Sequence, residues 1–221
     1  DPKFPPRGDS SHWFGGDGMI HAFHINDGKV SYLNRWMKTV KWKKEHEEQK
    51  ALWSSGMDVM NNDPSVSNIE TDGLANTAIV SHAGKIFALE EAHAPFEFDE
   101  MTLESKGSHT FDNKLQGPVT AHPKIDPVTG ELLFFGYMAD GFFTDTIRYT
   151  AVSKEGKITK SELIKAPFPS MVHDFFATQK YIVFPVFPLT GDFERALNGK
   201  PPFAWEPEQG THVCILPRDG S

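Results

Sequence analysis

Residues 19–36 read MIHAFHINDGKVSYLNRW, and this stretch decides the fold class. Two apolar or alternating runs, 19–25 and 30–36, enclose the turn sequence NDGK (26–29). An Asp-Gly pair between two such runs is a strong signal for a β-hairpin. The stretch therefore predicts two antiparallel strands joined by a tight turn.

The same unit of strand, glycine-containing turn and strand recurs along the chain. Further strands are expected at 78–81, 85–89, 132–137, 147–152, 157–160, 180–187 and 213–216. The turn glycines are irregularly spaced, so the sequence contains no strict repeat. Many short antiparallel strands predict an all-β sandwich, barrel or propeller. Long polar loops that alternate with tight hairpins favour the propeller.

One segment departs from the strand pattern. Residues 42–53, WKKEHEEQKALW, are highly charged and contain neither Gly nor Pro, which predicts a short helix with a solvated surface. Residues 54–72 are polar and rich in turn formers, so we expect a long loop there. The sequence shows no clear interdomain linker, and we expect a single domain over 1–221.

Composition and charge limit the class of partner. The chain of 221 residues has 22 Lys and Arg against 30 Asp and Glu, a formal net charge of −8. It contains no block of clustered cations, which argues against nucleic acid as a partner. The longest apolar run, 181–189, contains two prolines and is too short to cross a bilayer. Cys214 is the only cysteine, which fits a reducing compartment and leads us to expect a cytoplasmic location.

Two of the ten histidines occupy a distinctive setting. His122 in TAHP (120–123) and His173 in SMVHDF (170–175) each lie where an extended strand leaves a loop. Their separation of 173 − 122 = 51 residues is about one propeller blade, since blades commonly have roughly 40–50 residues. Equivalent positions on neighbouring blades point to one axis, where imidazoles can share Fe, Zn or Cu. From the pattern alone, metal ligation and a purely structural role both stay open.

Other catalytic signatures are missing from the sequence, including the Gly-x-Ser-x-Gly, His-Glu-x-x-His, Walker and Cys-x-x-Cys motifs. The glycine-rich GGDG (15–18) precedes an expected strand rather than a helix, which argues against a phosphate-binding loop. Glu90 and Glu91 are a candidate acid–base pair. Because adjacent strand residues face opposite sides of a sheet, at most one of the two can face the axis.

Five segments together resemble the carotenoid cleavage oxygenase family, which includes enzymes that cleave lignostilbenes and isoeugenol. They are HWFGGDGMIHAFHINDGKVSYLNRWMKT (12–39), LANTAIVSHAGKIFALEE (74–91), TAHPKIDPVTGELLFFGY (120–137), SMVHDFFATQKYIVFPVFPL (170–189) and FAWEPEQGTHVCILPRDG (203–220). They follow the family's order over nearly the whole chain. The resemblance implies an all-β, seven-bladed β-propeller with Fe(II) on its axis, held by four histidines. This chain resembles only part of that propeller and lacks its C-terminal blades.

The resemblance also implies roles for individual residues. His122 and His173 match the first two metal ligands, and the other two are expected beyond Ser221. Glu91 matches a glutamate that orients a ligand imidazole, which we take to be that of His173, and such a partner fixes the tautomer. Thr77 resembles a side chain near the open coordination positions, although it can also be read as an ordinary strand residue.

The implied reaction is oxidative cleavage of an alkene by O2 into two carbonyl products. Enzymes of the stilbene-cleaving branch hold a phenolic hydroxyl with a Tyr and a Lys, and counting from Thr77 places these positions on Met57 and Glu90. Met donates no hydrogen bond to a phenolate and Glu repels one. We therefore expect a small apolar alkene of the carotenoid or apocarotenoid type, with a stilbene or phenylpropanoid as the alternative.

The sequence is compatible with two other functions. One family branch keeps the fold and the iron but catalyses isomerisation or hydrolysis. A propeller fragment that binds a lipophilic ligand without metal is the third interpretation, which the absence of two ligands from the sequence supports. Because apolar substrates reside in bilayers, a peripheral contact with membranes is a further expectation.

Overall fold

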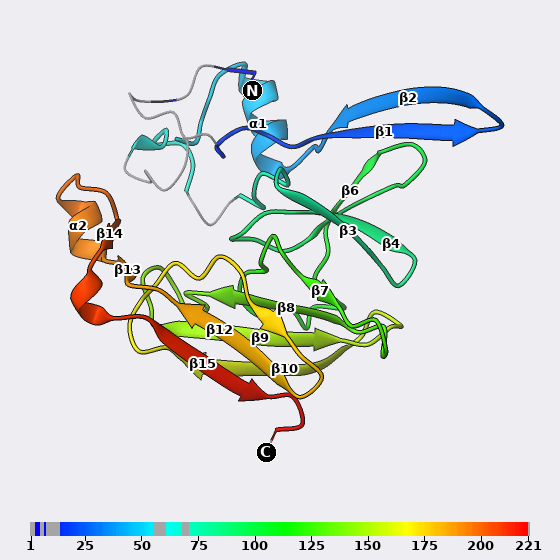
Figure 1. Ribbon diagram of the computed structural model, residues 1–221. Coiled ribbons are helices and arrows are strands. Elements are labelled where there is room, and N and C mark those ends of the chain that lie inside the picture. Colours follow the sequence, from blue (N-terminus) through cyan, green and yellow to red (C-terminus); the bar gives the residue numbers. More distant parts are fainter. Residues whose placement is uncertain (1–2, 5–6, 8–13, 55–60, 68–70, 221) are drawn as a thin grey trace. The chain divides into compact units, whose positions relative to one another are not determined.

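The computed structural model describes residues 3–4, 7, 14–54, 61–67 and 71–220 (Figure 1). The chain divides into two compact units, unit 1 (Asp1–Thr110) and unit 2 (Phe111–Ser221). The elements of unit 1 are β1 (Met19–Asn26), β2 (Lys29–Trp36), α1 (Val40–Glu48), β3 (Ala78–His82), β4 (Lys85–Leu89), β5 (Phe96–Phe98) and β6 (Ser105–Ser108).

The hairpin expected from the opening stretch is confirmed as β1 and β2. The two strands pair antiparallel in one continuous register, from Met19 with Trp36 to Asn26 with Lys29. The turn residue Asp27 has φ 48° and Gly28 has φ 72°. Two successive left-handed residues are what a two-residue turn between twisted strands requires, and Asp-Gly meets that requirement at little steric cost.

The expected helix over 42–53 is present as α1, but it ends sooner. Gln49 adopts the left-handed conformation, with φ 54°, and its backbone N–H bonds the carbonyl of Glu45. The carboxylate of Glu45 then accepts the backbone N–H groups of Leu52 at 2.9 Å and Trp53 at 3.1 Å. These hydrogen bonds fold the chain back, so residues 49–53 form a loop instead of another helical turn.

Strands β3 to β6 form an antiparallel sheet in which each strand neighbours the next along the chain. One face of the β1–β2 hairpin packs with this sheet in a shared core (Figure 1). Its buried residues are Ile20, Met37, Ala75, Ala88, Phe96, Phe98 and Leu103. Strands β3 and β4 were predicted from the sequence, but β5 and β6 were not. β5 has three residues and β6 has four, which is too short for an alternating pattern to be recognised.

Unit 2 contains one four-stranded sheet, in the order β10-β9-β8-β7, a second sheet, β11-β12-β15, and a two-stranded sheet, β13-β14. All three are antiparallel. The elements are β7 (Lys124–Ile125), β8 (Leu132–Tyr137), β9 (Thr146–Val152), β10 (Ile158–Lys165), β11 (Phe176–Ala177), β12 (Tyr181–Val186), β13 (Leu189–Gly191), α2 (Phe193–Leu197), β14 (Phe203–Trp205), the 3-10 helix η3 (Pro207–Gln209) and β15 (His212–Pro217).

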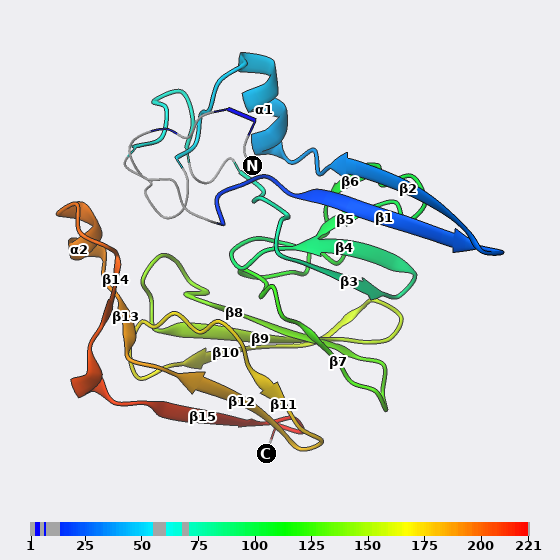
Figure 2. The same ribbon diagram turned by 45° about the horizontal axis from the view of Figure 1, so that its top comes forward.

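The second sheet lies across the four-stranded sheet in both views (Figures 1 and 2), and the apolar side chains between them form the core of unit 2. Phe135 of β8 is fully buried and contacts Phe175 and Phe184 edge to face, at ring-centroid distances of 5.1 and 5.3 Å. Burial also raises the pKa of Tyr149 to about 12. Because Phe175 is part of this core, the segment just before β11 is anchored to both sheets.

Candidate metal centre

His122 and His173 lie on two loops of unit 2 that each precede a short strand. His122 comes two residues before β7, and His173 comes three residues before β11. The chain is anchored beside both histidines, because Ala121 is buried next to the first and Val172 next to the second. His122 itself is partly exposed and His173 is exposed, so the neighbouring buried residues, and not the imidazoles, provide the anchoring.

The two imidazoles converge on each other. Their Nε2 atoms are 2.9 Å apart, and the rings are inclined by 66° with centroids 4.6 Å apart. Two nitrogen ligands at about 2.1 Å from one ion, at right angles to each other, would be about 3 Å apart. The spacing and the donor type therefore fit two neighbouring coordination positions of a divalent metal ion.

An ion pair joins the two histidine-bearing loops. Lys124, two residues after His122, places its Nζ 2.8 Å from Oδ1 of Asp174, the residue that follows His173. Burial raises the pKa of Asp174, but the hydrogen bonds from Lys124 and from the Phe175 amide outweigh this effect and hold the pKa below its ordinary value. Asp174 is thus a carboxylate at neutral pH, and it holds the two loops together. The sequence shows both charges, but only the fold brings them together.

Within the described residues, no group of three or more His, Cys, Asp and Glu side chains is arranged to hold a metal ion. The pair formed by His122 and His173 supplies two ligands. Met57, which the resemblance places at a substrate-binding position, lies outside the described residues.

Glu91, Thr77 and Glu90 all belong to unit 1. Glu91 lies two residues beyond the end of β4, and its Oε1 atom is shielded from solvent. Thr77 directly precedes β3, with an exposed side chain whose hydroxyl donates to Oδ1 of Asn76 at 2.9 Å. The expected link between Glu91 and His173 joins the two units and stays a prediction.

Glu90 is hydrogen-bonded to Nδ1 of His93, three residues further along the chain. Burial lowers the pKa of His93, but the hydrogen bond and the charge of Glu90, together with the charge of Asp72, outweigh it and raise the pKa. The raised pKa favours a protonated imidazole beside Glu90, and in that form it balances the charge of Glu90. The role of Glu90 in substrate binding stays a prediction.

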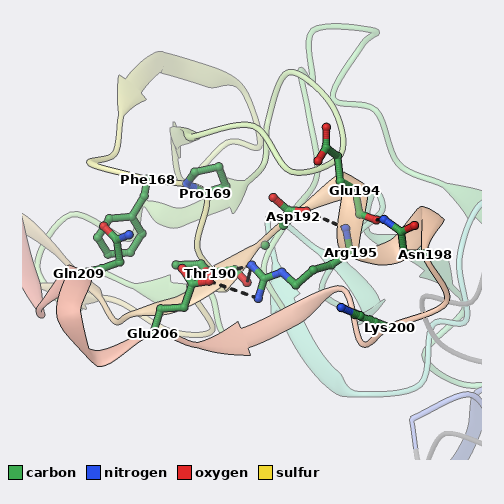
Figure 3. Close-up of a pocket in the computed structure, with 11 residues that line it drawn as sticks. Phe168, Pro169, Thr190, Asp192, Glu194, Arg195, Asn198, Lys200, Glu206 and Gln209 are labelled. Atoms are coloured by element: carbon green, nitrogen blue, oxygen red, sulfur yellow. Dashed lines mark hydrogen bonds and ion pairs between the residues drawn. The ribbon is translucent and has the colours of Figure 1, made fainter.

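A cavity of about 490 Å³ lies elsewhere in unit 2, lined by residues of β13 and α2 and of the segment that follows β14 (Figure 3). Arg195 spans it and donates from Nη2 to the backbone carbonyl of Thr190 at 3.1 Å and to its hydroxyl at 2.9 Å. The lining residues are Phe168, Pro169, Thr190, Gly191, Asp192, Glu194, Arg195, Asn198, Lys200, Glu206 and Gln209. They include none of the residues selected from the sequence.

None of the helices in the described ranges has the length and apolar character needed to span a membrane.

Known proteins resemble this chain over its whole length. The chain is 39% identical over 222 residues to the isoeugenol monooxygenase of Pseudomonas nitroreducens, covering 100% of this chain and 46% of that protein. It is 37% identical to resveratrol cleavage oxygenase 1 of Aspergillus fumigatus, covering 100% of this chain and 44% of that protein. The crystal structure of Pseudomonas brassicacearum lignostilbene dioxygenase matches with a TM-score of 0.92 at 39% identity, covering 100% of this chain and 46% of that one.

The chain thus spans just under half the length of these relatives. Its sheets reproduce the corresponding half of a β-propeller, which confirms the expected fold class. The family model described as retinal pigment epithelial membrane protein (RPE65) matches residues 1–221. On this match and these relatives, the chain belongs to the RPE65 and carotenoid cleavage oxygenase family.

Proposed function

We propose that the full-length protein is an Fe(II)-dependent oxygenase that cleaves an alkene C=C bond with O2 and gives two carbonyl products. The observation that carries the proposal is the convergence of the Nε2 atoms of His122 and His173 at 2.9 Å. Neutral imidazole nitrogens suit iron, and the relatives of this chain are named oxygenases. When bound, the iron would supply the activation of O2.

The residues of this chain would hold and shield the metal site. His122 and His173 would each present Nε2 as a lone-pair donor, which requires the proton on Nδ1. The Lys124–Asp174 ion pair would keep the two loops at their present spacing. Glu91 would accept a hydrogen bond from the Nδ1–H group of a ligand imidazole and so fix its tautomer, and Thr77 would border the access to the reacting atoms.

For the substrate we propose an aromatic alkene of the isoeugenol or stilbene type, with a carotenoid or apocarotenoid as the second candidate. Two observations favour the aromatic class. The relatives reported above are named for isoeugenol, resveratrol and lignostilbene. In addition, Glu90 is hydrogen-bonded to His93, whose raised pKa favours a cation at this position, and this weakens the argument that Glu90 repels a phenolate.

The test is turnover by the full-length protein, loaded anaerobically with Fe(II) and then supplied with ¹⁸O2. Isoeugenol, resveratrol and an apocarotenal are compared as substrates, and the aldehydes are identified by mass spectrometry. We expect labelled aldehyde products, with the aromatic alkenes cleaved faster than the apocarotenal. Faster cleavage of the apocarotenal would reverse the order of the two substrate classes.

Products that contain no label from ¹⁸O2 would contradict the oxygenase proposal and favour isomerisation or hydrolysis. Saturable binding of an alkene without any turnover would favour the metal-free binding function. A His122→Ala variant should be inactive. His212→Ala is the matched control, because His212 is exposed, hydrogen-bonds the carbonyl of Gln209 and contacts the ring of Phe168, away from the two candidate ligands.

A further inference from the structure

The glycine-rich segment 14–18 packs directly against the segment that carries Thr77. The backbone N–H of Gly18 donates to the carbonyl of Leu74 at 2.8 Å. A Cβ atom at Gly18 would lie 2.0 Å from the carbonyl oxygen of Ala75, so only glycine permits this approach. The GGDG motif thus serves close packing between two backbone segments, which explains a sequence feature that the proposed function does not use.

Two buried ion pairs that share Lys41 fix the same segment. Asp17 contacts Nζ of Lys41 at 3.1 Å, and that ammonium also bonds Glu45 at 2.8 Å. All three side chains are more than nine-tenths buried. These contacts hold segment 14–18 in one position, so a side chain that is hydrogen-bonded to this segment is held as well.

Asn76 connects this support to Thr77. Its Nδ2 donates to the carbonyl oxygen of Phe14 at 2.8 Å and to that of Gly16 at 2.6 Å. Because carbonyl oxygens only accept, the NH2 end of the amide must face them, and Oδ1 faces the opposite way. Oδ1 accepts the hydroxyl of Thr77 at 2.9 Å.

This arrangement determines the rotamer of Thr77. Thr side chains occupy staggered χ1 wells, and its hydroxyl and methyl groups are attached to the same carbon. When the hydroxyl is held by Asn76, the direction of the methyl group is fixed as well. The exposed side of Thr77 therefore presents one defined surface instead of an average over rotamers.

We propose that Asn76 is a positioning residue that selects the side-chain rotamer of Thr77 for the alkene-cleaving reaction. The inference rests on the proposed function, in which Thr77 borders the access to the reacting atoms. A purely structural Asn76 would instead act only through its bonds to Phe14 and Gly16, and would not depend on the hydroxyl of Thr77.

The first test is crystallographic and independent of activity. Structures of the full-length wild-type protein and of Asn76→Ala, Thr77→Val and Asn198→Ala are compared. Asn198 is the matched control, because its Nδ2 also donates to a backbone carbonyl, that of Glu194 at 2.8 Å. We expect one χ1 rotamer for Thr77 in the wild type and in Asn198→Ala, and a changed or mixed rotamer in Asn76→Ala. An unchanged single rotamer in Asn76→Ala would contradict the inference.

The second test is kinetic and uses a double-mutant cycle. Losing one hydrogen bond of about 1 kcal/mol corresponds to roughly a fivefold change in rate. We expect Thr77→Val and Asn76→Ala each to lower kcat about fivefold with little change in KM, and the double variant to be no slower than Thr77→Val. Thr77→Val keeps the bonds from Asn76 to segment 14–18, so it remains informative where Asn76→Ala does not fold.

The failures of the two proposals are distinguishable. Two results would overturn the role of Asn76 and leave the oxygenase function intact. One is a wild-type kcat for Thr77→Val. The other is that Asn76→Ala lowers kcat as much in the Thr77→Val background as it does in the wild type. A wild-type protein that cleaves no alkene, with Thr77 still held by Asn76 in its crystal structure, would overturn the proposed function and with it the catalytic purpose of this positioning.

Discussion

The Nε2 atoms of His122 and His173 lie 2.9 Å apart, although 51 positions separate the two residues in the chain. The spacing is set by the loops that carry them. Each loop is anchored in the core next to its histidine, and the Lys124–Asp174 ion pair connects the two loops one or two residues further on. The metal-binding geometry therefore depends on contacts that do not involve the imidazoles.

Replacing Asp174 tests this dependence. Asp174→Asn keeps the size of the side chain but removes the charge that holds Lys124, so the two loops should separate more easily. We expect the full-length protein to bind Fe(II) up to about fivefold more weakly, because a half-exposed ion pair contributes at most about 1 kcal/mol. Anaerobic titration with Fe(II) measures the change. The control is Glu155→Gln, whose exposed pair with Lys154 is 4.0 Å long; equal weakening in both variants would contradict the expectation.

The buried ion pairs of Lys41 predict a large loss of stability. Lys41→Met leaves the carboxylates of Asp17 and Glu45 buried with no cation, and their exposed fractions are only 9% and 3%. Breaking such a network typically costs about 3–5 kcal/mol of unfolding free energy. Denaturant unfolding of the full-length protein measures this loss. Lys50→Met removes a half-exposed pair with Asp63 and should cost less than about 1 kcal/mol. Similar losses of unfolding free energy in Lys41→Met and Lys50→Met would contradict this expectation.

The close approach of Gly18 to Ala75 predicts a second large loss of stability on mutation. In Gly18→Ala the new methyl group would collide with the carbonyl oxygen of Ala75, and backbone atoms cannot move aside as a side chain can. We expect a loss of at least about 2 kcal/mol. Gly28→Ala meets no atom within 4 Å and strains only its left-handed backbone, which costs about 1 kcal/mol. A smaller loss in Gly18→Ala than in Gly28→Ala would contradict this account.

The Glu90–His93 pair predicts a dependence of stability on pH. Because the folded-state pKa of His93 is raised, its protonated form stabilises the fold below the unfolded-state pKa of about 6.5, and this contribution is lost as the pH rises through the folded-state value. Relative to wild type, His93→Gln should therefore lower Tm more at pH 6 than at pH 9. Glu90→Gln removes the partner and should produce the same pattern. A Tm difference that does not vary with pH would refute the ion pair.

Much of the fold was predictable because its signals are local. The Asp-Gly turn and its flanking runs specify β1 and β2, and β-branched and aromatic residues specify β12. The end of α1 was not predictable, because it depends on a side chain of the helix bonding residues that follow it. The short strands β13 and β14 have only three residues each, which is too few to reveal a period.

The candidate site was predictable only in part. His122 and His173 could be selected from their settings and from the family resemblance. Their supports could not be, because Lys124 pairs with a residue 50 positions away and Asn76 with Phe14, 62 positions away. Contacts of that range depend on the topology of the sheets. The cytoplasmic location and a peripheral membrane contact stay predictions.

The central claim is that His122 and His173 bind one iron ion. The most direct measurement is the iron content per chain of the full-length protein after anaerobic Fe(II) loading, for wild type, His122→Ala, His173→Ala and the control His212→Ala. We predict about one iron per chain in the wild type and in His212→Ala, and almost none in the other two variants. Iron retained at the wild-type level by His122→Ala or His173→Ala, or no iron in the wild type, would contradict the claim.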